Sequence, residues 1–333
     1  MTPAVISLAF DPTVHLGPLA IRWETLGLGA SFFVALVVAA RSAVGGSAGG
    51  GLRRLRLDDL LYIVVAAMPG AVLGGRLVYA LDYLDYYRAQ PDALVDPGRG
   101  SLSLLGAVIG GAITALCMAR LLGAPVRRWL DALAVPLLVA IGLGKVTQLL
   151  GGGGQGVPFS GGWAVALQGA GPWLSVAPSV PAHPSQLYEA GWTLGGVVLV
   201  LAAGSGPVRR HLPGFTRQAG EWAARQAASE REVAQGTLRF GYRFLLALQW
   251  WLVGRVLVAF TWRDAPVAAG LDAEQLAAIA VLLASVLVGL AWALPAARPA
   301  PAPDAGEAPD AAEGRGTTGT PRQLDPLDRA GRD

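Results

Sequence analysis

The chain has 333 residues, of which 53% are hydrophobic and only 15% are charged, and its mean hydropathy is +0.47. Soluble globular proteins carry about 25% charged residues, so this composition excludes a disordered chain and argues against a water-soluble enzyme. The formal net charge of +3 is too small to indicate binding of a nucleic acid. The single cysteine, Cys117, excludes an internal disulfide or a multi-cysteine metal site, and its apolar surroundings predict a buried position. We expect no metal and no other cofactor.

Apolar segments of the length that spans a bilayer as a helix, about 20 residues, follow one another along the chain. They cover residues 21–40, 60–82, 101–122, 130–150, 186–203, 244–261 and 275–294. Helices are expected because an open strand would leave backbone polar groups unpaired in lipid. The sequence therefore predicts an all-α polytopic membrane protein with seven transmembrane helices.

The arginines between these segments predict their orientation. The first, third and fifth connections are rich in arginine, the second and sixth are acidic, and the fourth, residues 151–182, carries no charge. Cytoplasmic loops carry an excess of Lys and Arg, so the alternation predicts an N-terminus outside and a C-terminus in the cytoplasm. Beyond residue 294 the chain is rich in Ala, Pro, Gly and charged residues. We therefore expect a membrane domain at residues 1–294 and a disordered cytoplasmic tail at residues 295–333.

Ionisable and strongly polar side chains inside the apolar segments are functional candidates, because their burial in lipid is costly. Arg76 lies in the second segment, Lys145 and Gln148 lie near the outer end of the fourth, and Arg255 lies in the sixth. Lys145 is also the only lysine in the chain. Converging in the outer half of the bilayer, these side chains would form an anion site. The alternative is that each cation reaches the interface or pairs with a carboxylate. The candidate carboxylates are Asp131, Glu24 and Glu189.

The stretch HPSQLYE, residues 183–189, is the densest polar cluster at the start of any predicted segment. Its proline suits the first turn of a helix, and spacings of three place His183 near Gln186 and Gln186 near Glu189. Such a group, with Tyr188 beside it, could shuttle a proton or orient a phosphate. A local helix-capping network is the alternative.

Several stretches together resemble the prolipoprotein diacylglyceryl transferases, bacterial membrane enzymes with seven helices. In chain order they are LGP at 16–18, IRW at 21–23, GGRLVYAL at 74–81, SLSLLG at 101–106, GLGK at 142–145 and HPSQLYE at 183–189. Their order, their spacing and the expected topology agree with the family from about residue 16 to residue 294.

The resemblance implies transfer of a diacylglyceryl group from phosphatidylglycerol to the lipobox cysteine thiol of a prolipoprotein, in the bacterial inner membrane. Phosphatidylglycerol, membrane lipid and prolipoprotein signal peptides would be the partners. Cations would stabilise the phosphate as it gains negative charge. The residues implied in phosphate binding are Arg76, Lys145, Gln148 and Arg255. Those implied in catalysis are His183, Tyr188 and Glu189.

The chain departs from the family pattern at positions that matter for acid–base chemistry. Leu105 stands where the family has a histidine, Gly153 where it has a glutamate, and Ala259 where a glutamate follows the arginine of the sixth segment. Lys145 replaces an arginine and Glu24 replaces a tyrosine. Two hypotheses stay open: a diverged diacylglyceryl transferase, and a non-catalytic relative that binds anionic phospholipid or lipoprotein precursors. A small transporter has less support, because no inverted repeat is apparent.

Overall fold

The computed structural model describes residues 5–46, 55–94, 102–169, 171–204 and 241–293. Within these residues seven helices are long and apolar enough to cross a membrane, which confirms the seven-helix prediction. They are α1 (Trp23–Gly46), α2 (Leu57–Asp82), α4 (Leu104–Leu121), α5 (Val126–Gly151), α6 (Ser185–Gly204), α10 (Tyr242–Ala259) and α11 (Ala273–Ala293). The tail expected at residues 295–333 lies outside the described residues.

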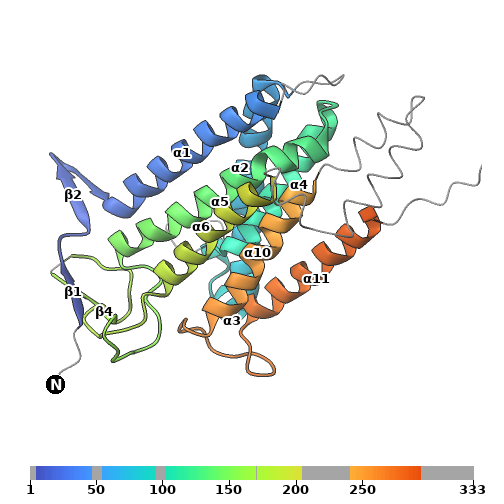
Figure 1. Cartoon of the computed structure of the whole chain (residues 1–333). Helices are drawn as coiled ribbons and strands as arrows, with labels where there is room; N and C mark the ends of the chain where they lie inside the picture. The colour runs from blue at the N-terminus through green and yellow to red at the C-terminus, as the bar shows by residue number, and fades with distance from the viewer. Residues whose placement is uncertain (1–4, 47–54, 95–101, 170, 205–240, 294–333) are drawn as a thin grey trace, which may run out of the picture. The chain divides into compact units, whose positions relative to one another are not determined.

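Shorter elements lie at the end of the helices where α1, α6 and α11 begin (Figure 1). Strand β1 (Ile6–Ala9) pairs in parallel with β4 (Val165–Gln168), and β2 (Thr13–Leu16) pairs antiparallel with β3 (Leu19–Arg22). Helix α3 (Leu84–Ala89) and the 3-10 helix η1 (Pro91–Leu94) follow α2. We call this region, residues 5–22, 84–94, 152–169, 171–184 and 260–272, the strand end.

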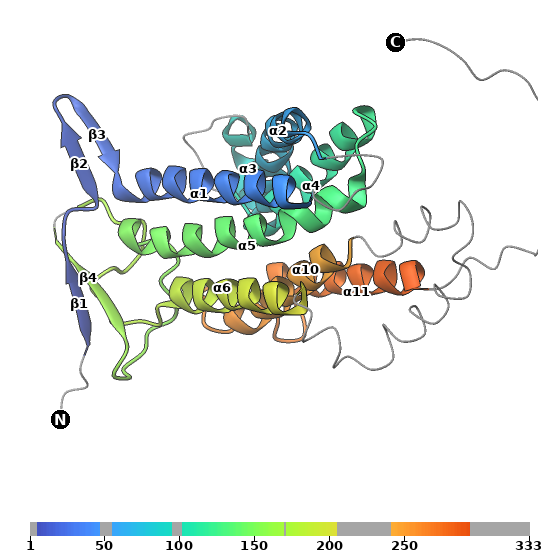
Figure 2. The same ribbon diagram turned by 45° about the horizontal axis from the view of Figure 1, so that its top comes forward.

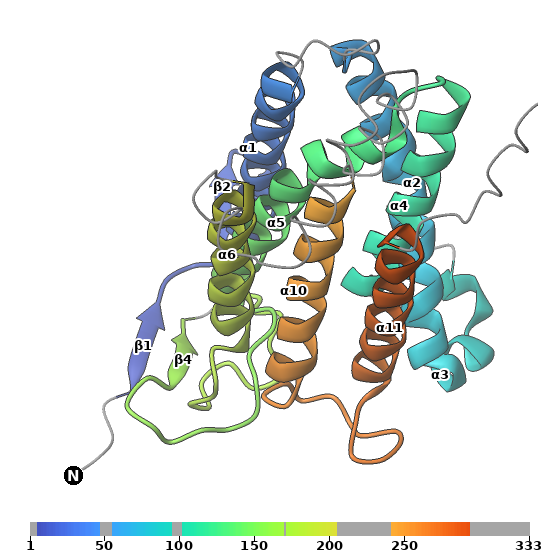
Figure 3. The ribbon, with the colours of Figure 1, turned by 45° about the vertical axis from the view of Figure 1, so that its right-hand side comes forward.

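Helix α5 lies between α1 and α6 (Figure 2) and also packs against α10, which packs on α11 (Figure 3). Helix α2 packs on α4. Their contact is built from glycines: Gly70 and Gly74 face Gly110 and Gly106 so closely that an added Cβ would collide with the opposite backbone. Small residues allow such close approach between membrane helices.

A reciprocal pair of tryptophans joins α6 to α10. The rings of Trp192 and Trp250 stack with centroids 4.5 Å apart and planes inclined by 15°. Each indole Nε1 donates to the backbone carbonyl of the other tryptophan at 2.7 Å. Gly254 lies against the ring of Trp192 and Gly196 against the ring of Trp250, where a side chain would collide. This tryptophan pair sets the spacing of α6 and α10, the two helices that carry charged groups described below.

The interior between α4, α5, α6, α10 and α11 is apolar, and the outer surface is apolar as well. Leu105 is 1% exposed within this core, whereas Leu73 and Phe33 are 70% and 65% exposed. An apolar surface of this kind fits contact with lipid. Cys117 was predicted to be buried, and this prediction is wrong, because the side chain is exposed on α4. An apolar run by itself does not distinguish a lipid-facing position from a core position.

Candidate active site

Three charged side chains from different helices meet between these helices, near the strand end. Lys145 Nζ of α5 lies 3.0 Å from Glu189 Oε2 of α6, and Arg255 Nη1 of α10 donates to the same oxygen at 2.8 Å. The exposed fractions of these side chains are 7%, 1% and 10%. Charges are tolerated at such burial when they are paired. Lys145 and Arg255 are thus brought together through Glu189, one of the carboxylates that the sequence offered as a partner.

A second carboxylate extends this cluster to α11 and α4. Glu274, in the first turn of α11, pairs with Arg255 Nη2. Ser103 Oγ donates to Glu274 Oε1 at 2.9 Å and accepts from the Gly106 backbone N–H at 3.2 Å as the N-cap of α4. The formal charges of the two cations and two carboxylates cancel. Glu274 was not predicted from the sequence as a site residue, because the acidic sixth connection was used only to predict the orientation of the helices. Its place in the first turn of a helix is a position that favours a carboxylate.

Trp262 covers the two cations. Its ring centroid lies 4.9 Å from Lys145 Nζ and 5.7 Å from Arg255 Cζ, which are distances of cation–π contacts. Gly154, with φ of +74°, approaches the indole so closely that a Cβ would meet it at 2.7 Å, and the Gln148 side-chain oxygen lies 3.2 Å from the same point. Gln148 is therefore placed beside Trp262, at the edge of the cluster.

Buried polar atoms without a hydrogen-bond partner among the described residues concentrate around this cluster. Gln186 is 0% exposed, and neither its Nε2 nor its Oε1 has a partner. Four further buried atoms likewise lack a hydrogen-bond partner among the described residues: Glu189 Oε1, Arg255 Nε, Gln148 Oε1 and Trp262 Nε1. A buried polar atom left unpaired costs about 1–3 kcal/mol. Their concentration here indicates a site for a polar ligand.

His183 and Tyr188 form a separate group at the strand end. His183 Nδ1 lies 3.1 Å from the Tyr188 hydroxyl, which accepts from Trp163 Nε1 at 2.7 Å. Phe159 stacks on the imidazole with ring centroids 3.9 Å apart. The neighbours Tyr188 and Glu189 thus belong to different groups, because successive residues of a helix point about 100° apart. Gln186, expected near both His183 and Glu189, is hydrogen-bonded to neither.

Arg76 is placed with the segment that follows α2. Its Nε donates to the Leu94 carbonyl at 3.0 Å and its Nη2 donates to the Ala93 carbonyl at 2.6 Å. Its guanidinium carbon also lies 5.8 Å from the centroid of the Tyr87 ring. These contacts fasten η1 and α3 to α2. The four side chains predicted to bind phosphate are therefore distributed over two groups, one around Glu189 and one around Arg76.

Glu24 and Gly153, two positions where the sequence is expected to depart from the family pattern, are neighbours in space. The Glu24 carboxylate of α1 lies against the end of α5: a Cβ on Gly151 would collide with its Oε2, and a Cβ on Gly153 would lie 3.7 Å from its Oε1. Gly152 between them has φ of +77°, a conformation that favours glycine. The glycines at the end of α5 thus lie against a carboxylate that α1 supplies.

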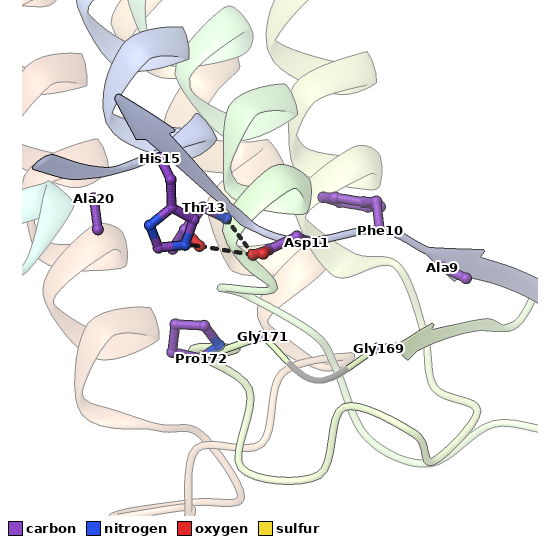
Figure 4. Close-up of a pocket in the computed structure, with 9 residues that line it drawn as sticks. All are labelled: Ala9, Phe10, Asp11, Thr13, His15, Ala20, Gly169, Gly171 and Pro172. Carbon is purple, nitrogen blue, oxygen red and sulfur yellow. Dashed lines mark hydrogen bonds between the residues drawn. The ribbon is translucent and has the colours of Figure 1, made fainter. Parts of the chain in front are cut away.

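An open pocket of about 580 Å³ lies elsewhere at the strand end (Figure 4). Asp11 Oδ1 accepts from the backbone N–H of Thr13 at 2.8 Å and from its hydroxyl at 2.7 Å, and the hydroxyl lies 3.3 Å from His15 Nε2. The hydrogen bonds from Thr13 hold the pKa of Asp11 below its ordinary value. The pocket shares no residue with the cluster around Glu189.

The fold and this cluster define a polytopic helical membrane protein with a polar site enclosed near one end of its helices. The family model of the prolipoprotein diacylglyceryl transferases matches residues 12–218. A phosphatidylglycerol–prolipoprotein diacylglyceryl transferase from Bordetella avium is 36% identical over 193 residues, which is 57% of this chain and 68% of that protein. The corresponding protein from Gluconacetobacter diazotrophicus is 33% identical over 224 residues, 65% of this chain and 74% of that protein. The chain belongs to the prolipoprotein diacylglyceryl transferase family.

This membership confirms the resemblance found in the sequence. Arg76, Lys145 and Glu189 lie within the residues that the family model matches, whereas Arg255 and Glu274 lie beyond them. The contact between Glu189 and Arg255 therefore joins the matched part of the chain to the part that follows it.

Proposed function

We propose that the chain transfers the diacylglyceryl group of phosphatidylglycerol to the thiol of the lipobox cysteine in prolipoproteins, in the bacterial inner membrane. The observation that carries this proposal is the buried pair of cations, Lys145 and Arg255, which share one oxygen of Glu189. Polar atoms with no hydrogen-bond partner in the described part of the chain lie around them. The activity named for the relatives supplies the reaction.

In this reaction a sulfur–carbon bond forms as the carbon–oxygen bond to the phosphate breaks. Glycerol phosphate leaves with an added negative charge, and the thiol proton passes to an acceptor. Lys145 and Arg255 stabilise the departing phosphate, and their effect is largest where water is excluded. Arg255 Nε has no partner among the described residues and is available to donate. Because Trp262 covers both cations, the phosphate reaches them past the indole.

We assign to His183 the role of accepting the proton of the lipobox thiol. The Tyr188 hydroxyl, itself held by Trp163, orients the imidazole through Nδ1. In the tautomer in which Nδ1 donates to Tyr188, Nε2 accepts a proton. Glu189 faces two cations, so its part is to position them rather than to take the proton.

The orientation predicted from the arginines completes the proposal. With the N-terminus outside and the C-terminus in the cytoplasm, the strand end faces outward and the arginine-rich connections face the cytoplasm. The membrane domain covers residues 1–294, and residues 295–333 form a cytoplasmic tail. The cluster around Glu189 then lies in the outer half of the bilayer, where a translocated signal peptide would present its cysteine.

A non-catalytic relative that binds anionic phospholipid is the second candidate function. It is favoured by Leu105, which stands where the family has a histidine and is 1% exposed in the apolar core. An alkyl side chain there can neither donate nor accept a proton.

A complementation assay separates the two functions. The chain is expressed in bacteria depleted of their own transferase, and thioether-linked diacylglycerol on a reporter prolipoprotein is measured by mass spectrometry. We expect modification, and an inserted chain that leaves the reporter unmodified would favour the binding protein. His183→Ala should abolish the modification, whereas His15→Ala, which removes an exposed histidine of the strand end, should retain it. Equal activity of the two variants would remove His183 from the reaction.

A further inference from the structure

Gln186 is a buried amide without a hydrogen-bond partner in the part of the chain that the structure describes. Its side chain is 0% exposed, and both its donor and its acceptor lack a partner among the described residues. Gln275 provides a contrast: it is 2% exposed, its Oε1 accepts from the Asp272 N–H at 2.9 Å, and its Nε2 donates to the Val256 carbonyl at 3.0 Å. Buried polar groups are normally paired in this way. The open donor and acceptor of Gln186 therefore indicate a ligand contact.

Gln186 lies next to the cation cluster. It precedes Glu189 by three residues on α6, and side chains at this spacing are neighbours on one face of a helix, with Cβ atoms about 5–6 Å apart. Glu189 uses Oε2 to contact Lys145 and Arg255, while its Oε1 has no hydrogen-bond partner within the described ranges. A group bound to Gln186 would therefore be a neighbour of Glu189, whose other oxygen contacts the two cations.

The donor and acceptor pattern identifies the chemistry of that group. Phosphate oxygens only accept hydrogen bonds, and an ammonium only donates them, whereas a hydroxyl does both. The amide of Gln186 offers the two N–H donors of Nε2 and the acceptor Oε1, and Glu189 Oε1 offers a further acceptor. A pair of hydroxyls can donate to both acceptor oxygens and accept from both N–H groups.

We propose that Gln186, together with Glu189 Oε1, binds the hydroxyls of the phosphatidylglycerol headgroup and thereby selects this lipid over phospholipids without them. The proposal rests on the proposed function, because it assigns the outer part of the same lipid substrate. Phosphate binding by Lys145 and Arg255 does not distinguish phosphatidylglycerol from other phospholipids. Gln186 adds that discrimination.

The test compares lipid donors that differ only in the hydroxyls. Phosphatidylpropanol has the charge and headgroup length of phosphatidylglycerol without either hydroxyl, and phosphatidylethanolamine carries an ammonium instead. The purified chain should transfer diacylglycerol from phosphatidylglycerol with a kcat/KM at least about tenfold above that for the other two lipids. Gln186→Met, which keeps the side-chain volume, should reduce this preference at least about tenfold through slower reaction of phosphatidylglycerol alone.

A stability measurement separates this role from a structural one. Replacing an unpaired buried amide by an apolar group of similar shape is neutral or stabilising. Without lipid, Gln186→Met should therefore resist unfolding by SDS in mixed micelles as well as the unchanged chain does, or better. The matched control, Gln275→Met, removes paired hydrogen bonds and should unfold at a lower SDS fraction while keeping the lipid preference.

The outcomes are distinguishable. An unchanged lipid preference in Gln186→Met, or a raised KM for the prolipoprotein peptide instead, would overturn the assignment while leaving the transfer reaction intact. If the unchanged chain transfers from none of the lipids, the proposed function fails. Retention of each lipid, measured by native mass spectrometry, then decides the assignment: loss of selective phosphatidylglycerol retention in Gln186→Met supports it, and equal retention refutes it.

Discussion

The substitution Glu189→Gln tests the buried charge cluster directly. It preserves the size of the side chain but removes the charge that faces Lys145 Nζ at 3.0 Å and Arg255 Nη1 at 2.8 Å. Arg255 then keeps its pair with Glu274, whereas Lys145 loses the carboxylate that it contacts. Removing one partner of a buried ion pair leaves an uncompensated charge, which costs about 3–5 kcal/mol. We expect a loss of this size in the free energy of unfolding.

The assay is equilibrium unfolding by SDS in mixed micelles, with helical content as the signal. A second variant combines Glu189→Gln with Lys145→Met and restores the balance between one cation, Arg255, and one carboxylate, Glu274. It should recover part of the lost stability, because residues in one ion-pair network couple by about 0.5–3 kcal/mol. A Glu189→Gln protein within about 0.5 kcal/mol of the unchanged chain, or strictly additive effects in the double variant, would refute the assigned pairing.

Three further predictions concern glycines and the strand end. Gly254→Ala should lower the free energy of unfolding by about 1–3 kcal/mol in the same assay, because the added Cβ would collide with the Trp192 indole. The control Gly191→Ala should have no such effect, because the space around Gly191 is open. Gly151→Ala should lower transfer activity, and Glu24→Ala should restore part of it by removing the colliding carboxylate; no rescue would contradict the contact. Because the pKa of Asp11 is lowered in the folded chain, its carboxylate stabilises the fold at pH values above the ordinary carboxyl pKa. This stabilisation is lost as the pH falls through the lowered pKa. Asp11→Asn should therefore flatten the acid-side pH dependence of tryptophan fluorescence, and an unchanged profile would count against this role.

The membrane helices could be predicted from the sequence because the signal is local. A run of apolar residues long enough for the bilayer determines a spanning helix whatever its neighbours are, and all seven predicted segments correspond to described helices. Family motifs such as HPSQLYE are likewise readable from consecutive residues. The buried position expected of Cys117 was wrong for a related reason: hydropathy reports an apolar environment, and lipid and core are both apolar.

The sequence by itself thus determined the fold class, the family and the set of charged candidates inside the helices. Only the tertiary structure decided which of them meet, because the contacts join distant residues: Glu189 and Arg255 are 66 positions apart, and Ser103 and Glu274 are 171 apart. The turn of the helix placed Tyr188 and Glu189 in separate groups, and Gln186 is buried without a partner among the residues that the structure describes. Spacing along the chain specifies which side chains share a helix face, but the packing of other helices decides what that face contacts.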